Sequence, residues 1–209
     1  MARIDDYKNA KKIAIEKLST EPFNDIVKRS KYEVIDTNAL KIPFLNRIFS
    51  LNYPDFQFMD ITDPDKEIPI QEQVLILHYL ASDSAVEPTG NWVSYREIPG
   101  ASFYFSAFIK RAVDPLKMVF GQNISGFMEA SKHLDGIPSD IGDAGFEYRI
   151  FPRVPMRIIL WKGDDEFPAE ANILFDQSIE GILSPEDIAW MAGMNVYRLI
   201  SLSKDKNKP

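Results

Sequence analysis

The stretch YEVIDTNALKIPFLNRIFSLNYPDFQFMDI, residues 32–61, decides the fold class. It consists of short segments rich in β-branched and aromatic residues, which are separated by turn residues at 36–38, 45–46 and 54–55. Such segments fit a pleated surface, so their succession predicts a β-meander. Pro43 lacks a backbone N–H, and we therefore expect its strand to lie at an edge of the sheet.

A second group of strand segments lies between residues 145 and 176, with the sequences GFEYRIF, PMRIILW and NILFD. In the first segment, apolar residues alternate with Glu147 and Arg149, which is typical of a strand with one buried face. The second segment is apolar enough for a strand that is buried on both faces. The three segments therefore predict further antiparallel sheet.

Apolar residues at helical spacing predict helices before, between and after these strand groups. The predicted helices cover residues 4–18, 20–30, 70–83, 106–121, 124–136 and 184–202. Pro115 falls inside one of them and predicts a break or a kink there. Ser184 followed by Pro185 is typical of an N-cap and a first helical position, and it predicts where the last helix begins.

Together these segments predict an α+β fold, in which the N-terminal meander and the C-terminal strands form antiparallel sheet packed with about five to six helices. Whether the two strand groups join into one sheet stays open at this point. A chain of 209 residues is compatible with one core, so we expect a single domain over residues 1–203. The basic sequence KDKNKP, residues 204–209, predicts a disordered tail.

The charge and the hydropathy exclude several classes of protein. A formal net charge of −7 and a pI near 4.9 argue against nucleic-acid binding, because proteins that bind nucleic acids contact the phosphates with basic surfaces. No apolar run approaches the roughly 20 residues of a membrane-spanning helix, and the N-terminus lacks the apolar stretch of a signal peptide. We therefore expect a cytoplasmic protein with no nucleic-acid partner and no membrane partner.

Cysteine is absent from the chain, which excludes disulfides, thiolate metal sites and an iron–sulfur cluster held by the chain's own thiolates. Any such cluster must belong to a partner. The sequence also contains no nucleophile elbow, no phosphate-binding glycine loop and no zinc-protease helix. A hydrolase or transferase of the common kinds is therefore not expected.

The stretch GDDEFPAEANILFD, residues 163–176, concentrates carboxylates around a short apolar core. It allows two interpretations, a carboxylate site that holds a metal or moves protons, and a polar turn between two strands. Gly163, Asp164 and Asp165 are typical turn residues, and the spacing of the carboxylates does not match a calcium-binding loop. We therefore interpret the stretch as a turn.

The two histidines are His78 and His133. His133 lies near the end of a predicted helix, where it can interact favourably with the helix C-terminus. His78 lies in the middle of the apolar helix, which predicts that its imidazole is buried and needs a partner. In a purely structural role, that partner is a backbone carbonyl or a tyrosine. In a functional role, the imidazole is an axial ligand of a cofactor metal or a general base that takes a proton from a substrate.

The segment SAVEPTGNWVSYREIPGASFYF, residues 84–105, combines loop-forming proline and glycine with several aromatic residues. Loops usually run over the surface, so aromatic residues there predict a ligand-binding surface. Arginines in aromatic segments can clamp the carboxylates or phosphates of a flat ligand, and we expect Trp92 to stack on the ligand while Arg96 binds it. The candidate ligand-binding residues are Trp92, Tyr95, Arg96, Tyr104, Arg153 and His78. The alternative is that the arginines pair internally with acids such as Glu97 and Glu147.

Several motifs taken together resemble one family. They are PFLNR, LHYL, PTGNWVSYREIPG, YFSAF, IGDAGFEYRIFPRVP and LWKGDDEFPAEANILFD. The chain is similar, from its first helix to its last, to the family called domain of unknown function 3786, from anaerobic bacteria and archaea. The resemblance implies no established reaction. It implies that some relatives carry an additional cysteine-rich module similar to the iron–sulfur module of corrinoid proteins, so this cysteine-free chain corresponds to the other part.

Three hypotheses about function follow. The leading one is a non-enzymatic ligand-binding or accessory module of anaerobic metabolism, with a tetrapyrrole such as a corrinoid as the candidate ligand. Its candidate partner is an iron–sulfur or corrinoid protein. The second hypothesis is a protein–protein interaction module, for which an acidic surface and proline-rich loops suffice. The third is a small enzyme that uses a carboxylate together with His78.

Overall fold

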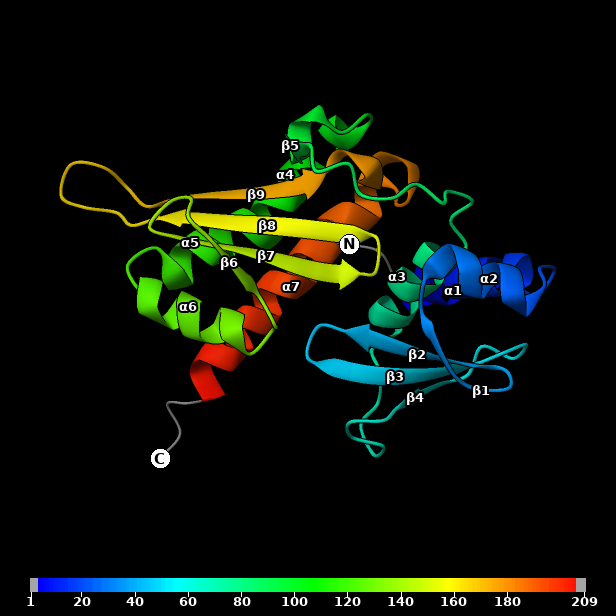
Figure 1. The fold of residues 1–209 in the computed structure, drawn as a ribbon. Coiled ribbons are helices and arrows are strands. Elements are labelled where there is room, and N and C mark those ends of the chain that lie inside the picture. Colours follow the sequence, from blue (N-terminus) through cyan, green and yellow to red (C-terminus); the bar gives the residue numbers. More distant parts are fainter. Residues whose placement is uncertain (1–3, 206–209) are drawn as a thin grey trace. The chain divides into compact units, whose positions relative to one another are not determined.

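The computed structural model describes residues 4–205, and the chain forms two compact units (Figure 1). The first unit contains the chain up to Glu87 together with residues 151–153 and 181–183, and the second contains the remainder. Each unit combines helices with an antiparallel sheet, which confirms the predicted α+β class. The expectation that residues 1–203 act as a single domain stays a prediction, because a division into two compact units does not test it.

The sheet of the first unit confirms the predicted meander. Its four strands lie in chain order: β1 (Glu33–Asp36), β2 (Ala39–Phe44), β3 (Arg47–Asn52) and β4 (Phe58–Asp60). The prediction that Pro43 marks an edge strand is wrong, because β2 lies between β1 and β3. Proline is tolerated there because β1 pairs with β2 only as far as Glu33 opposite Lys41, and Pro43 lies beyond that pair.

Three helices complete the first unit: α1 (Ile4–Leu18), α2 (Phe23–Ser30) and α3 (Ile70–Leu80). The largely apolar α3 packs against α1 and α2, as expected for a helix at the centre of a core. Its Tyr79 is completely buried and stacks on Phe151 with the ring centroids 4.5 Å apart. The hydroxyl of Tyr79 donates to the carbonyl of Ser30, so one side chain ties α3 to the end of α2.

The sheet of the second unit has five strands: β5 (Trp92–Ser94), β6 (Ile137–Ser139), β7 (Ala144–Phe151), β8 (Val154–Trp161) and β9 (Glu170–Asp176). Their order is β5-β9-β8-β7-β6, so the two strand groups form two separate sheets. The segment expected to be a loop contributes the edge strand β5. Two short 3₁₀ turns follow it, η1 (Tyr95–Glu97) and η2 (Ala101–Phe103).

The helices of the second unit are α4 (Phe105–Phe108), α5 (Asp114–Phe120), α6 (Ile124–Lys132) and α7 (Pro185–Asp205), and a 3₁₀ turn, η4 (Gln177–Gly181), follows β9. The long α7 runs diagonally across the strands of the sheet (Figure 1). It continues through residues 204 and 205 of the predicted tail, whereas residues 206–209 lie outside the described part of the chain. No helix within residues 4–205 is both long enough and apolar enough to cross a membrane.

The predicted break at Pro115 is a π-helical turn, η3 (Ile109–Val113), inserted between α4 and α5. In this turn the N–H of Asp114 donates to the carbonyl of Ile109, five residues earlier. Proline inside a helix lacks an N–H and its ring presses on the carbonyl four residues before it. The wider π turn therefore accommodates Pro115 while the helical segment stays continuous.

Candidate functional site

A pocket of about 230 Å³ lies in the second unit, beside the place where β5 ends against β9. β5 pairs with β9 only at residues 174–176, so residues 170–173 of β9 have a strand partner on one side, in β8. The pocket opens at this edge, between β9 and the helical segment that contains the π turn. It is lined by Ser94, Tyr95, Arg96, Phe105, Phe108, Ile109, Val113 and residues 171–174.

Tyr95 forms a rigid part of the pocket wall. Only 1% of the residue is exposed, and its ring stacks on Phe108 with the centroids 4.3 Å apart. Its hydroxyl donates to the carbonyl of Pro185 at 2.7 Å, and burial raises the pKa of this phenol. The expectation that this segment is an exposed loop is therefore wrong at Tyr95, because the 3₁₀ turn η1 directs the side chain into the core.

Arg96 lies at the rim of the pocket and is exposed. Its guanidinium carbon stands 3.9 Å from the centroid of the Phe105 ring, in a cation–π contact. It makes no hydrogen bond and no ion pair with any described residue, and the neighbouring Glu97 accepts from the N–H of Ser94 instead. A guanidinium offers five N–H donors in a planar fork, so Arg96 presents a prepared site for a carboxylate or a phosphate.

The π turn supplies the apolar side of the pocket through Ile109 and Val113. Such turns occur frequently at functional sites, because the extra residue per turn shifts side chains relative to the rest of the helix. The sequence alone did not indicate Phe105, Ile109 or Val113 as site residues. The signal that could have found them is Pro115, since a proline in a helical pattern indicates an irregular turn just before it.

Trp92 does not line the pocket. The guanidinium of Arg157 covers its ring at 4.0 Å, and Arg157 in turn pairs with Glu147 at 3.3 Å. The predicted pairing of Trp92 with Arg96 in one pocket is therefore corrected, since the stacking ring beside Arg96 is that of Phe105. The internal pairing considered for the arginines applies to Arg157.

Tyr104 is half-buried and also lies outside the pocket lining. Its hydroxyl interacts with Glu186, whose negative charge raises the pKa of the phenol. An anionic neighbour of this kind disfavours the binding of a second anion at the hydroxyl. Of the six predicted ligand-binding residues, the structure thus brings only Tyr95 and Arg96 to the pocket.

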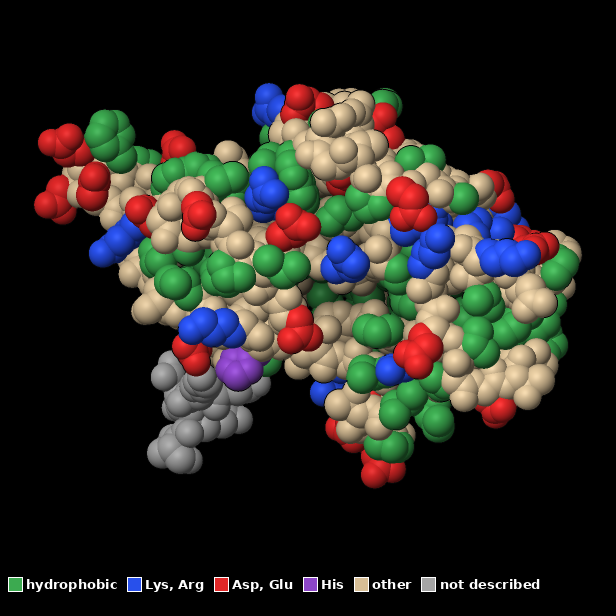
Figure 2. Space-filling view, in the orientation of Figure 1, with side chains coloured by type: hydrophobic (Ala, Val, Ile, Leu, Met, Phe, Trp, Pro, Cys, Tyr) green, Lys and Arg blue, Asp and Glu red, His purple; other side chains and the backbone are tan. Residues whose placement is uncertain are grey.

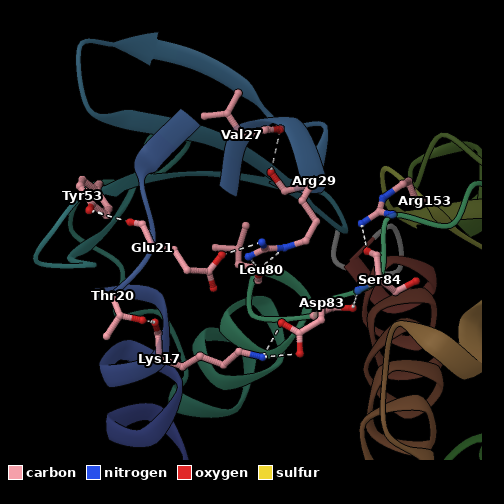
Figure 3. A network of polar contacts seen from close by, with 12 residues as sticks. Lys17, Thr20, Glu21, Val27, Arg29, Tyr53, Leu80, Asp83, Ser84 and Arg153 are labelled. Atoms are coloured by element: carbon pink, nitrogen blue, oxygen red, sulfur yellow. Dashed lines mark hydrogen bonds and ion pairs between the residues drawn. The ribbon is translucent and has the colours of Figure 1, made fainter. Parts of the chain in front are cut away.

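Arg153 and His78 belong to the first unit. Arg153 is 1% exposed and donates to the backbone carbonyls of Ser84 at 2.8 Å and Val86 at 3.2 Å, as Figure 3 shows for Ser84. Because its side chain is buried and bonds to these two carbonyls, Arg153 holds residues 84–86 within the unit and has little surface to offer a ligand. His78 is half-buried, so the predicted burial of its imidazole holds only in part, although its neighbours Leu77 and Tyr79 are completely buried.

The acidic stretch forms the predicted turn between β8 and β9. The side chain of Asp164 accepts from the N–H groups of Glu166 and Phe167, which lowers the pKa of this carboxyl. Figure 2 shows acidic side chains gathered on this projecting loop. Among the described residues no group of three or more carboxylates and histidines could hold a metal ion. The hydrogen bonds of Asp164 within the β8–β9 connection confirm the interpretation as a turn for this part of the stretch.

Asp176, at the end of the acidic stretch, has a structural role that the sequence did not indicate. It is 1% exposed and accepts hydrogen bonds from the N–H groups of Thr89, Gly90 and Ser178 and from the hydroxyl of Thr89. Burial alone would raise the pKa of its carboxyl, but these donors outweigh burial and lower it. Asp176 thereby fixes residues 89–90 just before β5, the strand whose end borders the pocket.

Comparison with known proteins gives a family and no function. Searches of the curated proteins and of the solved structures found no match to this chain. A family model does match, over residues 22–198, which includes both sheets and all the residues that line the pocket. The chain therefore belongs to the family described as a domain of unknown function, DUF3786.

Proposed function

We propose that this chain is a non-enzymatic binding module that recognises a carboxylate-bearing ligand at the pocket beside Arg96. The observation that carries the proposal is the state of Arg96, whose guanidinium is held over Phe105 while its donors engage no described residue. Arg149, in the same unit, is also exposed and engages no described residue, so what distinguishes Arg96 is the Phe105 ring beside it and its place at the rim of a pocket. The stacked ring limits the motion of the guanidinium, so less entropy is lost when a ligand binds.

The volume of the pocket restricts what it can enclose. About 230 Å³ is below the range of roughly 300–1,000 Å³ that is common for drug-sized ligands. A compact flat acid fits inside, with its carboxylate at Arg96 and its apolar part against Phe105 and Ile109. Haem would place one of its propionates at Arg96 and keep its macrocycle outside. A corrinoid such as cobalamin, whose peripheral side chains are amides, would instead offer the phosphate of its nucleotide loop to Arg96. An iron–sulfur or corrinoid protein, the partner suggested by the family resemblance, could deliver such a group.

Replacing Arg96 by alanine tests this proposal. We expect the variant to bind benzoate, and haem or cobalamin if these bind, about tenfold more weakly or worse, because a charge-assisted contact contributes about 1.5–3 kcal/mol. Titrations followed by NMR for benzoate and by absorbance for the tetrapyrroles measure the change. The melting temperature should stay nearly constant, since Arg96 is exposed and bonds to no described residue.

Arg149→Ala is the matched control, because Arg149 is an exposed arginine of the same unit that does not line the pocket. It should bind every probe as the unsubstituted protein does. If Arg96→Ala binds equally well, or if no carboxylate probe binds the unsubstituted protein at about 10 mM, where even weak specific sites are detected, the pocket assignment fails. Titration with haem and cobalamin decides separately whether the tetrapyrrole is the ligand.

The open edge of β9 favours a second candidate, a protein–protein interaction module. The N–H of Gln177 donates to the carbonyl of Asn91, on the side of β5. Backbone groups alternate along an antiparallel strand, so the N–H of Ala171 points to the same side, where β5 is missing. An extended partner segment that adds a strand there could place an acidic side chain at Arg96.

Ala171→Pro removes this N–H, and Ala171→Val keeps it. Peptides that bind the unsubstituted protein are first selected from a random library displayed on phage. Their affinity for Ala171→Pro should be about tenfold lower or worse, and their affinity for Ala171→Val should be unchanged. Equal binding to both variants rules out strand addition. Peptides that depend on Arg96 but not on the Ala171 N–H would instead support recognition of the carboxylate alone.

A further inference from the structure

A second pocket, of about 310 Å³, lies in the first unit and is independent of the Arg96 pocket. It is formed by α1, β4, the segment before α3 and the first turn of α3, and its lining includes Lys11, Phe58, Lys66, Glu67, Ile68 and Gln73. Phe58, Ile68 and Pro64 give it apolar surface, and Lys66 lies exposed at its border. Its size is at the lower end of the range for small-molecule sites.

Lys11 reaches into this pocket from α1 in a defined position. Its ammonium donates to the side-chain oxygen of Gln73 at 2.6 Å, and the amide nitrogen of Gln73 donates to the carbonyl of Ile68 at 2.8 Å. The second hydrogen bond fixes the amide so that its oxygen faces Lys11. The ammonium also lies 5.9 Å from the centroid of the Phe58 ring. An ammonium has three donors, and one of them is engaged.

No carboxylate of the described residues lies within ion-pair distance of Lys11. Asp60, which also lines the pocket, is bound by Arg47 at 2.6 Å and by the N–H groups of Thr62 and Asp63. Glu67 is exposed at the border. Burial lowers the pKa of Lys11, and no nearby negative charge in the described part of the chain offsets this effect by stabilising the protonated ammonium. A partly desolvated cation without a counter-ion is costly, and a bound anion removes that cost.

We propose that this pocket binds a small organic anion, with Lys11 and Lys66 as its cationic contacts and Phe58 against its apolar part. The anionic group is a carboxylate or a phosphate, since either offers oxygen acceptors for the two free donors of Lys11. The pocket is large enough for one aromatic ring with such a group. Gln73 is a positioning residue, because it holds the ammonium in place.

Reaction of the lysines with dilute acetic anhydride, read for each lysine by peptide mass spectrometry, tests the proposal. Benzoate and phenyl phosphate, each at about 10 mM, a concentration that occupies weak specific sites, are the probes, and sodium chloride at equal ionic strength is the reference. We expect the better probe to slow acetylation of Lys11 by about fivefold or more, as occupancy at that concentration implies. Lys12, its exposed neighbour on α1, should react at an unchanged rate. Whichever probe protects Lys11 at the lower concentration identifies the anionic group.

A charge substitution at Gln73 separates a bound anion from simple shielding. Gln73→Glu keeps the shape of the side chain but supplies Lys11 with an internal counter-ion, so protection by the probes should disappear. Gln71→Glu adds the same charge to the same helix outside the pocket lining and should leave protection intact. Equal protection in the Gln73→Glu variant, or no protection of Lys11 by either probe beyond that of sodium chloride, overturns the proposal. Arg96→Ala should not change the result, because Arg96 lies in the other unit.

Discussion

Replacing Arg47 by methionine is expected to lower the free energy of unfolding by about 3–5 kcal/mol, the usual loss when one partner of a buried ion pair is removed. Arg47 begins β3, and its Nε lies 2.6 Å from a carboxylate oxygen of Asp60. Its Nη1 lies 3.2 Å from a carboxylate oxygen of Glu72 on α3. The side chains of Arg47, Asp60 and Glu72 are 6%, 0% and 9% exposed. Without the guanidinium, two carboxylates remain buried close to each other, at one junction of sheet and helix.

Unfolding in urea, followed by circular dichroism, measures this loss. Lys41→Met is the matched control, because Lys41 pairs with Glu33 at 3.1 Å in the same sheet and the two side chains are 36% and 66% exposed. Lys41→Met should lower the free energy of unfolding by less than about 1 kcal/mol. The double variant Arg47→Met/Asp60→Asn should recover part of the stability, since it removes one of the two buried carboxylate charges that Arg47 had contacted. A loss for Arg47→Met no larger than that for Lys41→Met would show that the buried pair contributes nothing beyond a surface pair.

Asp176→Ala is expected to lower the free energy of unfolding by about 3 kcal/mol. The buried N–H of Ser178 loses its acceptor, which costs about 1–3 kcal/mol, and the part-buried donors of Thr89 and Gly90 lose hydrogen bonds to a charged group. The backbone N–H groups of Gly90 at 2.6 Å, Ser178 at 2.9 Å and Thr89 at 3.0 Å all donate to this carboxylate. Asp176→Asn keeps one acceptor oxygen, so its stability should lie between that of the unsubstituted protein and that of Asp176→Ala. Thermal and urea unfolding measure the differences. The control Asp165→Ala removes an exposed carboxylate of the β8–β9 turn and should change stability by less than about 0.5 kcal/mol.

The dependence of stability on pH provides a second measurement for Asp176. Its pKa is lowered in the folded protein, so the folded state holds the carboxyl ionised more strongly than the unfolded state does. The stabilisation is therefore fully present above the ordinary carboxyl pKa of about 4, and it is lost as the pH falls through the lowered value. The difference in stability between the unsubstituted protein and Asp176→Ala should shrink below about pH 4. A difference that stays constant from pH 7 to pH 3 would contradict the role of the charge.

The local structure could be predicted from the sequence because it depends on neighbours in the chain. Short β-branched segments between turns predicted the meander and the strands β7 to β9, and the apolar stretch from residue 70 predicted α3. Ser184 and Pro185 predicted the start of α7, where the Ser184 hydroxyl accepts from the N–H of Asp187. The turn at Asp164 followed from turn chemistry alone, because the side chain bonds to N–H groups two and three residues away.

The candidate site could be predicted only in part. Arg96 and Tyr95 were chosen from the sequence, since aromatic residues and arginine in a proline-containing segment indicate a binding surface. Which ring stacks on Arg96 depends on the exact course of the chain through η1 and α4, and it is Phe105 and not Trp92. Because β5 lies at the edge of the second sheet, the ring of Trp92 contacts the guanidinium of Arg157, which belongs to β8 far along the chain.

What the sequence by itself determined is thus the class of fold, the succession of elements except β5 and β6, and the absence of cysteine chemistry, because periodicity, turn residues and composition act locally. Only the tertiary structure decided that the strands form two sheets, that β5 ends early along β9, and that Lys11 lies in a pocket where no carboxylate of the described residues is within ion-pair distance of it. These features depend on contacts between residues far apart in the chain, such as Arg47 with Glu72 or Gly90 with Asp176. Their free energy comes from burial and from the pairing of charges, which no local pattern of residues specifies.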